Sequence, residues 1–368
     1  MPNTQTISRP SGELDLNLHI TDVCNYRCKH CYQDAYEEQG LSLTQIKKII
    51  RDFVTFARSM HLESKITILG GEPLVRDDLL EILIYIDTFR EHISYCDLIT
   101  NGSLLTDNFL KELRAKAPVV SLISISLDGD MKTHDAIRGD GAFDAALQAA
   151  LSARAHGFNI FFITIISRLN HKTIFNLLDL FLTYDIGISI SRVVPMGTGK
   201  QLEKQMLTPK ELRSFYQKIE RINKTYQLAP PPGLLALYKK TKNPTLLRHI
   251  RESRYLIQAF NCRNAVRHQE NVRDQGSHCK VRHRQLFAIL PDGTVYPCRT
   301  LPFRLGNILE SSFTELYEGV YTQFTHAEKQ DARCQSCSSY AGCEGGAPCI
   351  TLATTGTFYG KDPQCWQP

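Results

Sequence analysis

Strand–helix alternation over the first two thirds of the chain is the feature that most restricts its fold. Residues 15–20 have apolar side chains at every second position, which predicts a strand, and 43–60 have the apolar spacing of a helix. The same pair recurs at 65–71 with 77–92, 95–100 with 107–116, 119–129 with 142–157, 159–167 with 172–185, and 187–194 with 208–224. Such alternation predicts a parallel sheet with helices outside.

Six units are fewer than a closed eightfold barrel needs, so we expect an α/β fold, a partial, TIM-like (β/α)6 barrel. Functional side chains should then lie where strands end and loops begin. The unusual stretches at these places are Cys24, Cys28 and Cys31, "GGEP" at 70–73, "TNG" at 100–102 and "SLDG" at 126–129.

Cysteine usage points to metal or redox chemistry. The chain has 12 cysteines: three lie at 24–31, Cys96 stands alone, and the rest lie between 262 and 365. There is no apolar run long enough to span a membrane, and the first residues lack the apolar core of a secretory signal. We therefore expect a cytoplasmic protein without membrane association, where clustered cysteines favour metal sites over disulfides. The net charge of +5 is too small to indicate nucleic-acid binding.

The loop "CNYRCKHC" has the spacing C-x3-C-x2-C. Three thiolates can hold three corners of an iron–sulfur cube and leave one iron open to a non-protein ligand. Zinc is the alternative, with His30 as a fourth ligand, but His30 lies between Cys28 and Cys31, where zinc geometry would be strained.

This loop, with aromatic His30 before its last cysteine, resembles the signature of the radical S-adenosylmethionine (SAM) family. The resemblance implies that Cys24, Cys28 and Cys31 hold a 4Fe–4S cluster that binds SAM, and that a 5'-deoxyadenosyl radical takes hydrogen from a substrate. "GGEP" resembles the family's site for the methionine part of SAM, formed by Gly70, Gly71, Glu72 and Pro73. By the same resemblance, further SAM contacts are Asn101, Ser126 and Asp128, and "IRG" at 137–139 also recurs in relatives.

The tail resembles the SPASM domain of such enzymes, a cysteine-rich C-terminal extension. Gly293-x4-Cys298 and Cys334-x2-Cys337-x5-Cys343 match its pattern, whereas the next interval has five residues instead of three. The resemblance implies two auxiliary 4Fe–4S clusters. The first would use Cys279, Cys298 and Cys349, with Cys262 as a candidate fourth ligand; the second would use Cys334, Cys337, Cys343 and Cys365. A structural zinc domain is the alternative.

Four segments follow: an N-terminal tail at 1–14, a barrel at 15–225, a helical bridging segment at 226–278 and the SPASM domain at 279–368. From 239 to 284 the chain has twelve Lys or Arg against three Asp or Glu. This basic stretch is either a solvated helical face or a path for an acidic substrate.

Three functions stay open. The preferred one is maturation of a ribosomally made peptide by crosslinking or oxidation; the second is modification of a tetrapyrrole or other small carboxylate; the third is a non-enzymatic zinc-binding scaffold. Sulfatase-maturing relatives have an acidic residue after the G-x4-C cysteine, and Arg299 here argues against that activity. Expected partners are a peptide or small-molecule substrate, an electron donor of flavodoxin or ferredoxin type, and a separate leader-peptide-binding protein. No catalytic base is identified.

Overall fold

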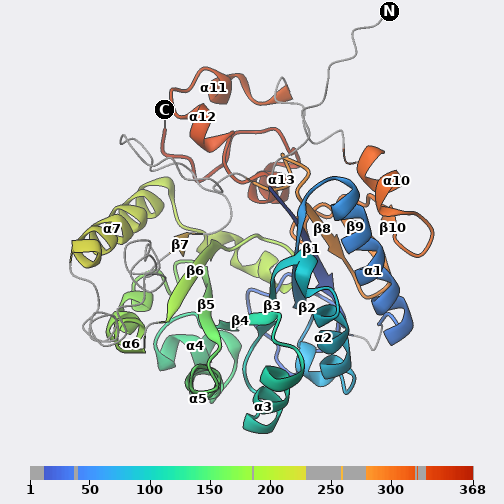
Figure 1. Ribbon diagram of the computed structural model, residues 1–368. Helices are drawn as coiled ribbons and strands as arrows, with labels where there is room; N and C mark the ends of the chain where they lie inside the picture. Colours follow the sequence, from blue (N-terminus) through green and yellow to red (C-terminus); the bar gives the residue numbers. More distant parts are fainter. Residues whose placement is uncertain are drawn as a thin grey trace, which may run out of the picture.

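The computed structural model describes residues 12–36, 40–184, 186–228, 258–259, 279–319, 321 and 329–367. Their strands form one sheet in the order β10-β9-β8-β1-β2-β3-β4-β5-β6-β7 (Figure 1). The first six strands are parallel and follow chain order: β1 (Glu13–His19), β2 (Glu63–Leu69), β3 (Ile93–Thr100), β4 (Val120–Ser126), β5 (Asn159–Ile166) and β6 (Gly187–Arg192). The predicted partial barrel with a C-terminal SPASM segment is confirmed.

Helices cover the outer face of this sheet. They are α1 (Leu43–Ser59), α2 (Leu79–Asp87), α3 (Asp107–Lys116), α4 (Met131–Arg138), α5 (Ala142–Ala155), α6 (Leu178–Tyr184) and α7 (Pro209–Leu228). Short 3-10 turns are η1 (Pro73–Val75), η2 (Arg90–His92), η3 (Thr173–Leu177) and η4 (Gly197–Gln205). Helix α4 is not among the elements predicted from the sequence. Its start is capped by Asp130, whose side chain accepts a hydrogen bond from Thr133 N.

The two faces of each strand differ in polarity, as the alternation in β1 illustrates. Leu14, Leu16 and Leu18 are fully buried in the hydrophobic core, on the face toward the helices. Asp15 and His19 alternate with them and so face the lumen of the barrel. Polar side chains of β1 therefore line this part of the lumen, while the leucines pack against the helices.

The sheet is longer than the six predicted strands, because tail residues add to its edge. Strand β8 (Leu286–Ile289) pairs in parallel with β1, and β9 (Thr294–Tyr296) and β10 (Gly306–Asn307) follow as antiparallel strands. At the opposite edge, β7 (Gln258–Ala259) pairs with β6. Of the basic bridging segment at 226–278, the described residues are 226–228 at the end of α7 and the two residues of β7; the other residues of this segment lie outside the described ranges.

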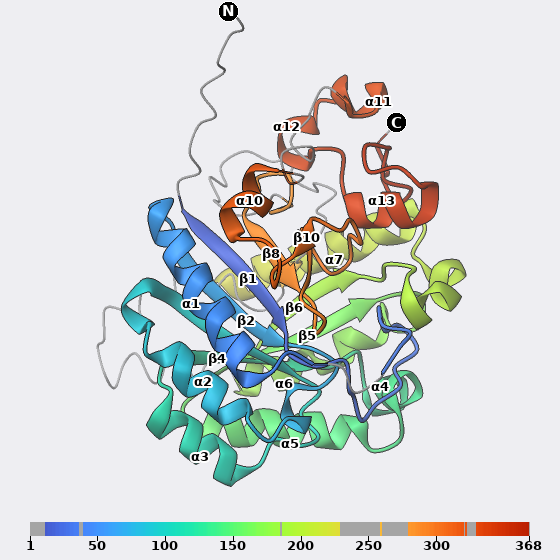
Figure 2. The same cartoon turned by 90° about the vertical axis from the view of Figure 1, so that its right-hand side faces the viewer.

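The tail completes the molecule with α10 (Phe313–Glu318), α11 (Ala332–Gln335), α12 (Tyr340–Cys343) and α13 (Pro348–Thr355). Figure 2 shows α10 near α1, and α11 to α13 on the side away from α2, α3 and α5. The contacts that attach this region to the barrel include the two that follow. Aromatic rings of α1, β8 and α10 pack together, with Phe56 stacked 6.0 Å from Phe313. Buried Arg192 at the end of β6 also forms an ion pair of 2.7 Å with Asp362.

No helix in the described ranges is long and apolar enough to cross a membrane.

Candidate functional site

The three-cysteine loop follows β1 and is clamped by the segment that follows β6. The Thr198 hydroxyl donates to the carbonyl oxygens of Cys28 and Cys31, at 3.1 and 3.2 Å. Gly199 N donates to Cys31 O at 2.9 Å. A Cβ on Gly197 would lie 2.3 Å from the backbone of Tyr32, so only glycine permits this close approach. The loop conformation is thus set by a segment about 170 residues away in the sequence.

Each of the three sulfurs accepts a hydrogen bond. The donors are Tyr26 N to Cys24 Sγ at 3.4 Å, Gln33 N to Cys31 Sγ at 3.4 Å, and Arg138 Nη1 to Cys28 Sγ at 3.6 Å. Burial raises the pKa of the Cys28 thiol to about 11, although Arg138 opposes the shift. Donors aimed at sulfur suit thiolates that carry metal, and such bonds tune iron–sulfur clusters. The loop therefore fits a cluster.

Within the described residues, no three His, Cys, Asp or Glu side chains converge closely enough to hold a single metal ion.

Glu72 lies beside this loop and is completely buried. Its carboxylate accepts hydrogen bonds from Thr100 Oγ1 at 2.7 Å, Asn101 N at 2.7 Å and Leu74 N at 3.2 Å. Burial raises its pKa, while these three donors oppose the shift. The carboxylate is fixed in orientation and would attract an ammonium group such as that of SAM.

The two glycines before Glu72 allow its strand end to pair with the cysteine loop. Gly71 N donates to Thr21 O at 2.7 Å, and Glu72 N donates to Val23 O at 2.9 Å. A Cβ on Gly71 would lie 2.2 Å from Val23 O, so any larger residue would separate the two segments. Buried Pro73 then begins η1.

The structure gives the other predicted SAM contacts different surroundings. Asn101 uses its side chain within the protein, because its amide donates to Asn25 Oδ1 at 2.9 Å and its oxygen accepts from Ser103. Ser126 is half-buried at the end of β4, and its hydroxyl makes no hydrogen bond to the described residues. Ser126 is therefore available to a ligand, whereas Asn101 supports the cysteine loop.

Asp128 is fully buried, and both its oxygens have protein partners. Oδ2 accepts from Arg138 Nε at 2.6 Å and lies 2.8 Å from His30 Nε2; Oδ1 accepts from Ile165 N at 2.9 Å. Burial alone would raise the pKa of this carboxyl, but Arg138 and His30 hold it below its usual value. Asp128 thus holds the aromatic residue of the cysteine motif in place.

Three tail cysteines form one group. Burial, together with the neighbouring thiols of Cys349 and Cys298, raises the pKa of Cys279 to about 12. None of the three forms a disulfide, so they could bind one auxiliary cluster. Cys262 lies outside the described residues. Cys96 is fully buried in β3 as part of the hydrophobic core.

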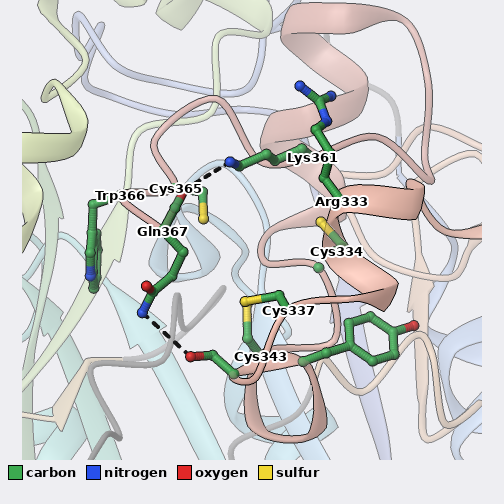
Figure 3. Close-up of a pocket in the computed structure, with 11 residues that line it drawn as sticks. Arg333, Cys334, Cys337, Cys343, Lys361, Cys365, Trp366 and Gln367 are labelled. Carbon is green, nitrogen blue, oxygen red and sulfur yellow. Dashed lines mark hydrogen bonds between the residues drawn. The ribbon is translucent and has the colours of Figure 1, made fainter.

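A second group surrounds a cavity near the C-terminus (Figure 3). Its cysteines are Cys334, Cys337, Cys343 and Cys365. Burial raises the pKa of Cys334, and the nearby thiols of Cys365 and Cys343 add to this shift. Four sulfurs on one cavity match the four ligands of a complete 4Fe–4S cluster.

Sequence reasoning missed one group of side chains between the cysteine loop and the tail. The guanidinium of Arg299 lies 5.1 Å from the ring centroid of Tyr32, and the His19 ring lies 6.0 Å from the same ring. In the sequence, Arg299 stands out by its position directly after Cys298, but nothing there links it to Tyr32 or His19. His19 carries no motif that could have singled it out.

Comparisons with known proteins assign the class. A model of the radical SAM superfamily matches residues 18–181, and a model of the SPASM iron–sulfur cluster-binding domain matches 279–338. The chain belongs to the radical SAM superfamily and carries a SPASM domain. It is an enzyme whose barrel domain binds a 4Fe–4S cluster and SAM, and whose SPASM domain binds auxiliary iron–sulfur clusters. A non-enzymatic zinc scaffold is therefore wrong.

Individual relatives cover nearly the whole chain. The Fe-coproporphyrin III synthase of Methanosarcina barkeri is 26% identical over 95% of this chain and 86% of its own. An AdoMet-dependent heme synthase of Oleidesulfovibrio alaskensis is 25% identical over 100% and 91%. The mycofactocin maturase of Mycobacterium tuberculosis is 26% identical over 96% and 82%.

Among solved structures, SuiB of Streptococcus suis bound to S-adenosylmethionine matches with a TM-score of 0.72. The match has 18% identity and covers 97% of this chain and 78% of that one. It shows a shared fold.

Proposed function

We propose that this enzyme modifies a carboxylate-bearing side chain of a tetrapyrrole. The observation that carries the proposal is similarity along the entire chain, barrel and SPASM domain together, to enzymes named for coproporphyrin and heme synthesis. The order of preference reverses that expected from sequence patterns alone, where a peptide substrate comes first.

The site residues have separate roles in this proposal. Cys24, Cys28 and Cys31 would hold the SAM-binding cluster, which, when bound and reduced, supplies the electron that cleaves SAM to the hydrogen-abstracting 5'-deoxyadenosyl radical. Glu72 would bind the ammonium group of SAM, and Ser126 would contact its ribose. Asp128 acts indirectly, by holding His30 and Arg138 against the loop.

The tail cysteines would hold two auxiliary clusters, one on Cys279, Cys298 and Cys349 and one on the four cysteines of the cavity in Figure 3. An electron donor of flavodoxin or ferredoxin type would reduce the enzyme. The domain boundaries given by the sequence, with a barrel at 15–225 and a SPASM domain from 279, are kept as part of this proposal.

A ribosomally made peptide is the second candidate substrate. The observation that favours it is the similarity to the mycofactocin maturase, at 26% identity over 96% of this chain. In that case a separate leader-peptide-binding protein would deliver the substrate.

The deciding experiment incubates the anaerobically reconstituted enzyme with SAM and dithionite. Coproporphyrin III, its iron complex and short peptides encoded beside the gene are the trial substrates, and products are identified by mass spectrometry. A tetrapyrrole lighter by carbon dioxide and two hydrogens, formed with 5'-deoxyadenosine, would support the proposal. Unchanged tetrapyrroles together with a peptide lighter by two hydrogens would overturn it in favour of the second candidate.

A further inference from the structure

Arg299 carries a positive charge that no described residue neutralises at contact distance. Its side chain is half-buried, and the structure gives it no hydrogen bond or ion pair with a described residue. Its Nε atom is buried without an acceptor. Its guanidinium lies over the face of Tyr32, with 5.1 Å from the guanidinium carbon to the ring centroid. A guanidinium has five N–H donors arranged to bind a carboxylate. No carboxylate of the described residues is bound to the Arg299 guanidinium.

His19 has the second unpaired polar atom of this region. The residue is 1% exposed, and its Nε2 atom has no hydrogen-bond partner. Its position on β1 places it on the lumen face of the sheet. Its ring meets the Tyr32 ring edge to face, with an interplanar angle of 84°. A neutral histidine can donate one hydrogen bond to an incoming oxygen.

The Tyr32 ring contacts both Arg299 and His19. Its hydroxyl donates to Gly70 O at 3.3 Å, which ties the ring to the segment that precedes Glu72. Tyr32 follows Cys31 of the SAM-binding loop directly, and Arg299 follows Cys298 of the tail. The unpaired donors therefore lie between the predicted SAM site and an auxiliary-cluster site.

The nearby acids do not account for Arg299. Asp22 is close enough for Arg299 to lower its pKa, against a larger rise caused by burial. However, Asp22 Oδ1 accepts from Gln33 Nε2 at 2.9 Å, and it makes no ion pair with Arg299 in the described structure. Asp292 is exposed to solvent. Leaving a buried donor unpaired costs roughly 1–3 kcal/mol, so the buried Nε of Arg299 requires a partner, and a bound carboxylate is one that can supply it.

We propose that Arg299 and His19 together bind a carboxylate of the substrate, with Tyr32 fixing both side chains. This inference rests on the proposed tetrapyrrole function and deepens it, because it names the residues that recognise the side-chain carboxylate. An acidic side chain of a peptide offers the same chemistry, and the experiment separates the two sources.

The test uses the full-length, anaerobically reconstituted enzyme and coproporphyrin III as the probe. Arg299→Gln removes the charge, Arg299→Lys keeps the charge without the planar fork, and Arg304→Gln removes an exposed arginine of the same loop as a control. We expect Arg299→Gln to raise the Kd and KM by roughly 10–100-fold with a much smaller change in kcat. Arg299→Lys should recover part of the loss, and Arg304→Gln should match wild type.

Two further measurements exclude a purely structural effect. The tetramethyl ester of coproporphyrin III should bind weakly, and equally to wild type and Arg299→Gln, because it presents no carboxylate. His19→Phe, which fills the same space without a donor, should raise the Kd about fivefold, the value of one neutral hydrogen bond. Iron content of each variant checks that the neighbouring cluster is retained.

The inference is overturned if Arg299→Gln binds and converts the tetrapyrrole like wild type, or if the ester binds as tightly as the acid. If wild type and the Arg299 variants convert coproporphyrin III equally well, this inference falls and the proposed function stands. A wild-type enzyme that neither binds nor converts any tetrapyrrole would overturn the proposed function as well. If an acidic peptide is bound instead and Arg299→Gln weakens it, the carboxylate site stands and the tetrapyrrole source falls.

Discussion

Arg138 joins Asp128 to Cys28: its Nε donates to Asp128 Oδ2 at 2.6 Å, and its Nη1 donates to Cys28 Sγ at 3.6 Å. The side chains of Arg138 and Asp128 are almost completely buried, with exposed fractions of 9% and 0%. The same carboxylate oxygen lies 2.8 Å from His30 in the cysteine loop. One buried acid therefore fixes both a donor to a cluster ligand and the aromatic residue of the motif.

Asp128→Asn should raise the reduction potential of the SAM-binding cluster by roughly tens of millivolts. The substitution removes a buried negative charge and leaves Arg138 facing Cys28, so the added electron is better stabilised. The measurement is a redox titration followed by electron paramagnetic resonance. Asp140→Asn, an exposed position near the same helix, should leave the potential unchanged. Equal potentials for wild type and Asp128→Asn would show that this network does not act on the cluster.

Glu72→Gln should weaken SAM binding by roughly 10–100-fold, the effect of losing a hydrogen bond to a charged group. Its amide would also present donors to Thr100 or Asn101 N, which already donate to this site. Equilibrium dialysis with labelled SAM measures the affinity, and iron analysis checks that all clusters are loaded. Undiminished affinity in a fully loaded variant would remove Glu72 from the SAM site.

Arg192→Gln should release the C-terminal segment from the barrel. Arg192 forms an ion pair with Asp362 and donates to Gln364 at 2.9 Å, both buried, so removing one partner costs roughly 3–5 kcal/mol. Cys365 follows directly, so we expect the loss of about four irons per chain, the content of one cluster. The exposed pair of Arg168 and Glu211 provides the control, because Arg168→Gln should keep its iron. Full iron content in Arg192→Gln would contradict the assignment of Cys365.

The buried carboxyl of Asp97 should make the free energy of unfolding depend on pH. Burial raises the pKa of this carboxyl to about 7, and the hydrogen bond from Ser124 opposes the shift. Because the folded pKa is higher than the unfolded one, its contribution is fully present below the unfolded pKa and is lost as pH rises through 7. Wild type should lose about 1 kcal/mol more than Asp97→Asn between pH 6 and 8. Denaturant unfolding at both pH values measures this difference, and parallel losses would contradict the shift.

The parts of the site that sequence predicts are those encoded by local patterns. Strand periodicity together with "GGEP" places Glu72 at the end of β2, and the spacing of Cys24 to Cys31 indicates a cluster without any structure. The glycines that allow the close approach are also visible in the sequence.

The remaining contacts depend on pairs far apart in the chain. His30 meets Asp128 across 98 residues, and Thr198 meets Cys28 across 170. Strand register and helix packing bring such pairs together, and no single segment contains that information. Strand β8 was missed for a related reason: "LFAI" is a short apolar run without periodicity, and only its pairing with β1 defines it as part of the sheet.

Transfer of deuterium from substrate to 5'-deoxyadenosine is the most direct test of the central claim. Coproporphyrin III labelled with deuterium on its side-chain methylene carbons is incubated with reduced enzyme and SAM, and the 5'-deoxyadenosine is analysed by mass spectrometry. The account predicts deuterium in the 5'-deoxyadenosine and none with a Cys28→Ala variant. If the wild-type enzyme forms 5'-deoxyadenosine that contains no deuterium, the tetrapyrrole side chain is not the hydrogen source and the proposed substrate is wrong.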